Sequence, residues 1–165
     1  MAKKVRSQLL QNAQKAVIDY LARQGQQMVD DAYRTKETHD KSGNMRDAYG
    51  WAVYVNGAIV RRGDTGAQTS TKVHKGWEKH NIPANTGRGY LDDFFDTYQD
   101  VPERGMALVV VNAVYYTSIL EDGAQGRPSV PVSTQYRIIS QVADNIYDIK
   151  RHFKGSVVKA ISPTE

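Results

Sequence analysis

A chain of 165 residues with 40% apolar and 24% charged residues is long enough for one hydrophobic core, and its composition argues against extensive disorder. It contains no cysteine, which excludes disulfides and thiolate metal sites, and no apolar run approaches the roughly 18 residues that a membrane span needs. We therefore expect a single soluble domain over residues 1–165, made in the cytoplasm and needing no cofactor.

Positive charge is concentrated in two segments, although the net charge is only +4. Residues 1–25 contain five basic residues against one acidic residue, and residues 61–90 contain six against two. Such segments can approach nucleic acid through electrostatic attraction. They are also typical of a solvated helix face and a solvated loop, and the absence of a compact Lys/Arg run favours this second interpretation.

The first predicted element is a long helix from Lys4 to Tyr33, because apolar residues recur there at spacings of three and four. Gly25 is a weak point near its end. One stripe is expected to face the core, with polar residues outside. The stripe comprises Val5, Leu9, Ala13, Ala16, Val17, Tyr20, Leu21, Ala22 and Met28, and the outer side comprises Gln11, Gln14, Lys15, Asp19, Arg23 and Gln26.

A β-hairpin is predicted next. Residues Tyr49–Val55 have the alternating pattern of a strand, and Asn56-Gly57 separates them from a second apolar stretch, Ala58–Val60. Asn-Gly supplies the two positive-φ positions of a type I′ turn. Because both faces of the hairpin carry apolar side chains, we expect a helix to cover one side.

Residues 61–105 are predicted to form a long loop excursion with one short helix, since only Leu91, Phe94, Phe95 and Tyr98 show helical spacing. A loop this long is usually functional or mobile. One hypothesis is that the excursion is mobile in the free monomer and becomes ordered when it docks on a neighbour. The alternative is a surface loop that is already folded and has no partner.

The remainder predicts a buried strand at Met106–Val111, a short helix at Val114–Leu120, a final helix at Ser133–Phe153 and a loose tail at 154–165. This order of elements predicts the α+β class. The expected fold is an antiparallel β-sheet with a β-hairpin, covered by a long N-terminal helix and a C-terminal helix, plus the long loop excursion.

No enzyme template is complete in this sequence, and we expect neither a catalytic site nor a metal site. His74 and His80 are six residues apart, which is not the spacing of a helical zinc pair. Asp92, Asp93 and Asp96 are explained by a short amphipathic helix with acidic residues near its N-terminus. A small hydrolase that uses Asp92, Asp93 and His80 remains an open alternative.

Tyrosines outnumber phenylalanines by ten to three, a bias that suits partly hydrated interfaces. Tyr115 and Tyr116 are adjacent, so they cannot both face one core from a regular element. One of the two is therefore a candidate interface residue, although a ring that packs inward beside one that reaches to solvent explains the pair equally well.

Two blocks of the sequence, Ser42–Gly50 and Val114–Gly123 with Pro128 and Pro131 after it, together resemble the HK97 gp10-like family of tail-completion and neck proteins of tailed phages. Residues 42–50, Ser-Gly-Asn-Met-Arg-Asp-Ala-Tyr-Gly, resemble the family's TGNLRxSI block. Residues 114–123, Val-Tyr-Tyr-Thr-Ser-Ile-Leu-Glu-Asp-Gly, with Pro128 and Pro131 after them, resemble its xYAxxxExGT block. The order of helix, first block, strands, second block and helix agrees as well.

The resemblance implies a structural virion protein of the head-to-tail connection, in a ring of about six or twelve copies around the DNA conduit. Its partners would be other copies, portal-side or tail-tube proteins, and DNA passing through the lumen without sequence-specific binding. A nucleic-acid-binding accessory protein that uses residues 1–25 and 61–90 is the alternative. Candidate interface residues are Trp77, Phe94, Phe95, Tyr98, Tyr115, Tyr116, Glu121 and Arg127, and candidate DNA-facing residues are Arg61, Arg62, Lys72 and Lys75.

Overall fold

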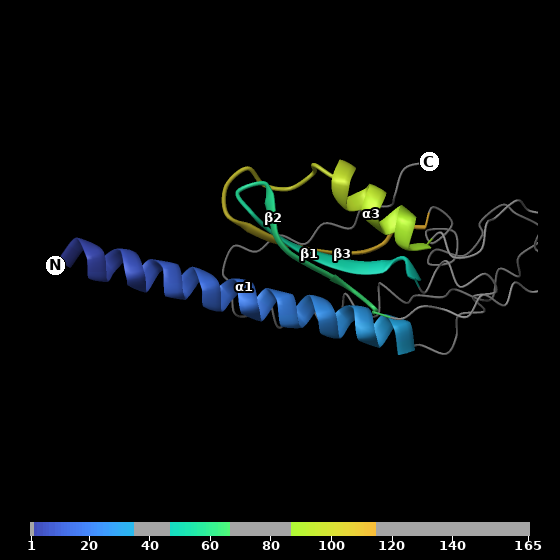
Figure 1. The fold of residues 1–165 in the computed structure, drawn as a ribbon, viewed down its shortest axis with the longest axis horizontal. Coiled ribbons are helices and arrows are strands. Elements are labelled where there is room, and N and C mark those ends of the chain that lie inside the picture. Colours follow the sequence, from blue (N-terminus) through green and yellow to red (C-terminus); the bar gives the residue numbers. More distant parts are fainter. Residues whose placement is uncertain (1, 35–46, 67–86, 115–165) are drawn as a thin grey trace, which may run out of the picture.

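The computed structural model describes residues 2–34, 47–66 and 87–114, and the structural statements below refer to these residues. They form a three-stranded antiparallel sheet of order β2-β1-β3 with one helix on each face (Figure 1). This arrangement confirms the α+β class. The elements are α1 (Ala2–Arg34), β1 (Tyr49–Val55), β2 (Ala58–Asp64), α3 (Gly87–Thr97) and β3 (Met106–Asn112). The helix predicted at Ser133–Phe153, the tail at 154–165 and nearly all of the short helix at Val114–Leu120 lie outside the described residues.

Helix α1 has the predicted extent, but its predicted apolar stripe is wrong in the first half. The buried residues of the helix all belong to its second half: they are Leu21, Ala22, Gly25, Met28, Val29 and Ala32, with Val17, Ile18 and Tyr20 partly buried before them. By contrast, every side chain from Lys4 to Ala16 is exposed, although this part holds the first four apolar members of the stripe. Gln26, expected on the outer side, faces the sheet and bonds to Trp51.

The central strand β1 is covered on both faces, because successive side chains of a strand point to opposite sides. Tyr49, Trp51 and Val53 pack against α1, whereas Ala52 and Tyr54 pack against α3. The expectation of a helix on one side of the hairpin is therefore incomplete. The second cover is α3, which the sequence placed in the loop excursion.

Trp51 joins three elements on the α1 face. Its ring lies directly against Gly25 of α1 and Gly63 of β2, since a Cβ added at either glycine would come within 3 Å of ring atoms. Its Nε1 donates a hydrogen bond of 2.8 Å to Gln26 Oε1, and Gln26 Nε2 donates to the Asp64 carbonyl oxygen at 3.0 Å. Packing and hydrogen bonds thus fix α1 across β1 and β2.

The predicted turn is confirmed by its backbone. Asn56 and Gly57 have φ values of 50° and 81°, the two positive angles that a type I′ hairpin needs. Asn56 also ties the turn to the start of β3: its backbone N–H donates to the Gly105 carbonyl oxygen at 2.9 Å, and the Gly105 N–H donates to Asn56 Oδ1 at 2.9 Å.

The positive φ of Gly57 restricts which residues this position accepts, and this restriction can be tested. Gly57→Val should lower the free energy of unfolding by about 1–2 kcal/mol, because a β-branched side chain is strained at positive φ. Gly57→Asn is the matched control and should lose much less, since asparagine tolerates that conformation. Urea unfolding followed by circular dichroism measures both. Equal stability of the valine variant and the parent would contradict the hairpin geometry.

Strand β2 is longer than predicted, which shortens the excursion expected at 61–105. Its last residues, Arg61 to Asp64, continue to pair with β1. The pairing shifts register between Val53 and Tyr54, because Val53 pairs with Arg61 and Tyr54 with Ile59. Val60 is therefore the extra residue of a β-bulge. After this bulge Arg61 and Gly63 face α1, whereas Arg62 and Asp64 face α3.

Candidate assembly surfaces

Polar residues of β2 form ion pairs with both helices. Arg61 Nη1 lies 2.9 Å from Asp19 Oδ1 of α1, a charge contact without hydrogen-bond alignment. On the other face, Arg62 Nη2 lies 3.4 Å from Asp92 Oδ1, and Arg88 Nη2 donates to Asp64 Oδ2 at 2.6 Å. Exposed pairs of this kind each contribute at most about 1 kcal/mol. Their main effect is to neutralise charge along β2.

These ion pairs involve Arg61 and Arg62, two of the residues predicted to face DNA. Arg61 and Arg62 are about half exposed, with 49% and 51% of their side-chain surface accessible, so both reach solvent. Each nevertheless has a carboxylate beside it, and the two side chains point to opposite faces of the sheet. They do not form a continuous basic patch. The other two residues of this group, Lys72 and Lys75, lie outside the described residues.

The predicted aromatic anchors divide into a core residue and surface residues. Phe95 is buried with Leu91 in the core between α3 and the sheet, which removes it from the surface. Phe94 and Tyr98 are half-buried, and their rings stack with centroids 4.8 Å apart and planes 20° apart. Among the predicted anchors in the described part of the chain, these two keep surface for a partner. The remaining interface candidates, Trp77, Tyr115, Tyr116, Glu121 and Arg127, lie outside the described residues.

The acidic residues of α3 are on its outer side. Asp92, Asp93 and Asp96 are all exposed, and Asp92 faces Arg62. Among the described residues, no group of three or more His, Asp or Glu side chains is placed to hold a metal ion. His74 and His80 fall outside the described ranges.

Two titratable groups in the described part are shifted in ways that keep their ordinary form at neutral pH. Burial, followed by the nearby Tyr98, raises the pKa of the Tyr54 hydroxyl, which stays protonated. The hydrogen bond from Arg88 to Asp64 raises the pKa of the guanidinium, which stays charged. Neither group is poised to transfer a proton at neutral pH.

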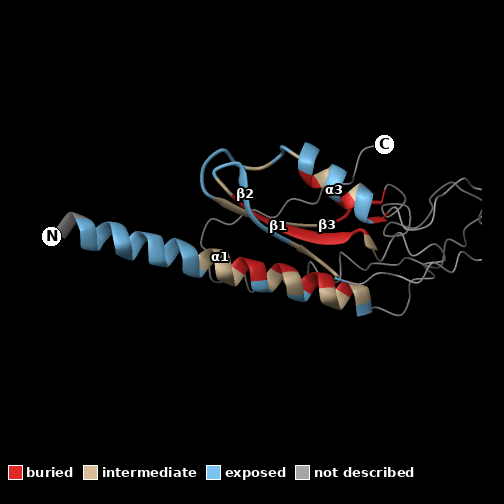
Figure 2. Cartoon of the chain, viewed as in Figure 1, coloured by how far each residue is buried: buried red, intermediate tan, exposed pale blue. Residues whose placement is uncertain are grey.

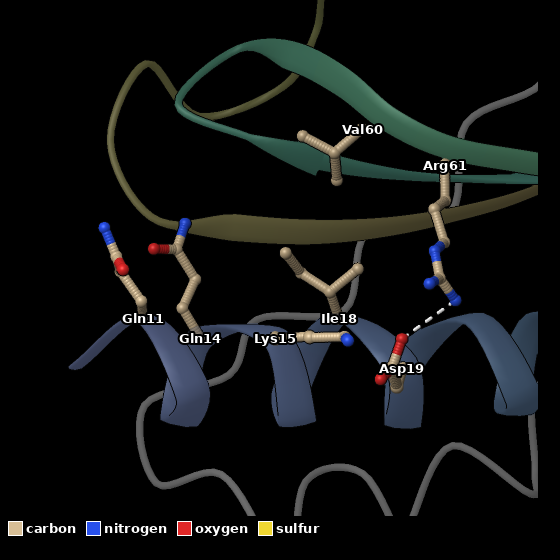
Figure 3. A pocket seen from close by; sticks show the side chains of 7 residues that line it. All are labelled: Gln11, Gln14, Lys15, Ile18, Asp19, Val60 and Arg61. Carbon is tan, nitrogen blue, oxygen red and sulfur yellow. Dashed lines mark ion pairs between the residues drawn. The ribbon is translucent and has the colours of Figure 1, made fainter. Parts of the chain in front are cut away.

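A shallow pocket of about 300 Å³ lies between α1 and β2 (Figure 3). It is open to solvent, and its one ion pair is the contact between Arg61 and Asp19. Lys15 also lines the pocket, and the rest of the lining is amide and aliphatic. Its residues are Gln11, Gln14, Lys15, Ile18, Asp19, Val60 and Arg61.

The first half of α1 extends past the sheet with its surface exposed (Figure 2). We call residues 4–16 of this helix the arm. The arm carries exposed Val5, Leu9 and Leu10, with 58%, 63% and 64% of their surface accessible. The other exposed large hydrophobic side chains of the described residues are Ile59 and Val60, which follow the hairpin turn. Sequence reasoning missed this surface because it assigned the arm's apolar residues to the core.

Comparisons of the chain with models of protein families, with curated proteins and with solved structures found no match. Neither described helix contains a stretch that is apolar and long enough to cross a lipid bilayer.

Proposed function

We propose that this chain is a structural component of the head-to-tail connection of a tailed bacteriophage and forms a closed ring around the DNA conduit. The observation that carries the proposal is the set of exposed aliphatic side chains on the arm, Val5, Leu9 and Leu10, with a second exposed pair, Ile59 and Val60, beside the hairpin turn. Scattered exposed hydrophobics are ordinary, but Val5 and Leu9 are four residues apart on one exposed side of a helix, which is typical of an interaction surface. In a ring, a second subunit would cover it.

The sequence blocks support the same function. The first block, residues 42–50, leads directly into β1, and the second begins at Val114, shortly after β3. The proposed assignment to a virion, the position in the neck and the copy number of about six or twelve all rest on the family resemblance. The segment from Tyr115 to Arg127 belongs to the proposed subunit contacts together with the edge strand β2.

The charge distribution fits a conduit through which DNA passes without being held. Arg61, Arg62 and Arg88 each have a carboxylate partner, which lowers the electrostatic attraction of this part of the chain for a phosphate backbone. A strongly basic lumen would release many counterions on binding DNA and would retain it. We therefore propose that Arg61, Arg62, Lys72 and Lys75 border the DNA path without specific contacts.

Negative-stain electron microscopy of the purified full chain tests the assembly. We expect closed rings, and Ile59→Lys should reduce their number because it places a charge in the proposed contact. Gln27→Lys is the matched control, since it adds the same charge at an exposed position of α1 away from the turn. A wild-type chain that remains monomeric at all concentrations, or a virion reconstruction that holds it as a lone monomer, would overturn the proposal.

A nucleic-acid-binding accessory protein is the second candidate, favoured by one observation. Within the described residues, Lys4, Arg6 and Lys15 form no ion pair, so the arm keeps its positive charge. If phosphate contacts by the arm dominate, Lys4→Gln with Arg6→Gln should reduce the slope of DNA affinity against salt by about 2. A monomer whose DNA affinity hardly depends on salt would remove this candidate.

A further inference from the structure

One apolar stripe of the arm points away from the sheet on which the rest of α1 packs. With 100° between successive residues, Val5, Leu9, Ala13 and Ala16 form a stripe about 160° around the helix from the buried residues of the second half. The sheet-facing side of the arm carries Gln11 and Gln14, which line the pocket beside β2 (Figure 3), together with exposed Leu10. The sheet that covers the second half of α1 therefore cannot cover this stripe, which needs a different partner.

The charge of the arm indicates what kind of partner fits. Arg6 lies about 65° around the helix from the centre of the stripe, Lys4 and Lys15 lie further round, and there is no acidic residue before Asp19. The N-terminal end of a helix also carries partial positive charge. A complementary surface must therefore combine apolar side chains with several carboxylates.

The outer side of α3 has this composition. Between Arg88 and Arg104 the chain has five acidic residues and no basic residue. Exposed Asp93 and Asp96 form no ion pair within the described part of the chain. Half-buried Tyr90 and Phe94 are four residues apart and so share one side of the helix, and Asp93, three residues after Tyr90, borders that side. At 1.5 Å per residue, the 11 residues of α3 span about 16 Å and the arm about 20 Å, so the two helices match in length.

The arm and α3 of one chain cannot meet, because α1 and α3 lie on opposite faces of the sheet (Figure 1). We infer that the arm of one copy docks on α3 of the next copy, with the arm's apolar stripe against Tyr90 and Phe94 and its cations against Asp93 and Asp96. This contact joins two different surfaces, so it propagates from copy to copy and closes when the rotation permits. The inference rests on the proposed ring and names the contact that builds it.

Two charge-reversal variants of the full chain test this contact. The first, Lys4→Glu with Arg6→Glu, makes the arm acidic, and the second, Asp93→Lys with Asp96→Lys, makes α3 basic. Asp92 is left unchanged because it faces Arg62. Each variant alone should self-associate at least about tenfold more weakly than wild type, because its contact brings like charges together. An equimolar mixture should recover association, since each arm then meets an α3 of opposite charge.

Sedimentation velocity at low salt measures the three samples and the wild type. Recovery of association in the mixture supports the docking contact. If the arm binds DNA or anionic vesicles instead, the mixture stays dissociated. Association of the wild type without any effect of the variants overturns this inference while leaving the ring proposal standing. A wild type that stays monomeric overturns both.

A matched pair of leucines tests the orientation of the stripe. Leu9 and Leu10 are equally exposed, but they point about 100° apart around the helix, and only Leu9 lies in the stripe. Leu9→Gln should weaken self-association several-fold more than Leu10→Gln, while both variants keep the thermal stability of the monomer. An equal or larger effect of Leu10→Gln would show that the arm uses another face.

Discussion

Trp51→Ala should lower the free energy of unfolding by about 3–5 kcal/mol, the range found when large aromatic side chains are removed from cores. Trp51 is 6% exposed and packs between Gly25 and Gly63. Its removal leaves a cavity at the point where α1, β1 and β2 meet, and it also leaves Gln26 Oε1 without the Nε1–H donor. Urea unfolding followed by far-UV circular dichroism measures the change.

Two further variants help to separate the contributions that the packing of the Trp51 ring and its hydrogen bond to Gln26 make to stability. Trp51→Phe retains an aromatic ring but loses the hydrogen bond to Gln26, so its loss should be smaller than that of the alanine variant. Ile59→Ala is the control, because Ile59 is 37% exposed and its truncation should change stability by less than about 1 kcal/mol. If Trp51→Ala unfolds no more easily than Ile59→Ala, the arrangement of α1 on the sheet is wrong.

Gly25→Ala should also destabilise the protein, although alanine is the better helix former by about 1 kcal/mol. The added Cβ would lie 2.8 Å from Trp51 Cγ and 3.0 Å from Leu108 Cδ1, closer than van der Waals contact permits. To relieve this clash, α1 must move away from the sheet. Overpacking of this kind lowers the free energy of unfolding by about 1–3 kcal/mol. The same urea measurement applies.

A double-mutant cycle identifies the cause of that loss. In the Trp51→Ala background the ring is absent and the Leu108 side chain can move into the space it leaves, so Gly25→Ala should be neutral or stabilising by up to about 1 kcal/mol. The change of sign between the two backgrounds is the expected signature of a steric contact. A loss that is the same in both backgrounds would place the cause in the helix itself.

Local signals allowed the first half of the fold to be predicted. The hairpin was predicted because Asn56-Gly57 and the alternation in Tyr49–Val55 are short-range features, and the φ values of 50° and 81° agree with them. The extent of α1 was predicted for the same reason. Local pattern predicts only a weak point at Gly25, because its partner, Trp51, is distant in sequence and no local pattern reports a close approach between two elements.

The other differences between prediction and structure arise because hydrophobicity is not a measure of burial. Arg61 to Asp64 contain no apolar residue, so nothing marked them as a strand that is held by ion pairs on both faces. The arm is the opposite case: it is apolar at helical spacing and yet exposed. Its signal was present in the sequence, since its stripe is out of phase with the stripe that begins at Leu21.

The candidate surface was only partly predictable. Phe94, Phe95 and Tyr98 were grouped as interface anchors by composition, but helical geometry turns Phe95 inward and leaves the other two at the surface. The acidic residues of α3 were explained by their position near a helix end. Their relation to the arm needs the sheet between them, and that arrangement is tertiary.

The bulge at Val60 determines which changes in hairpin length the chain can accept. As long as the bulge is kept, one residue more or fewer between Gly57 and Arg61 would exchange the faces of the last four residues of β2. Asp64 would then lie on the side of Trp51, and Gly63 would leave the ring without its close neighbour. Related chains should therefore lengthen or shorten this hairpin by even numbers of residues, or lose the bulge when they lose one. The parity of the strand, more than the identity of its residues, keeps each arginine beside its own carboxylate.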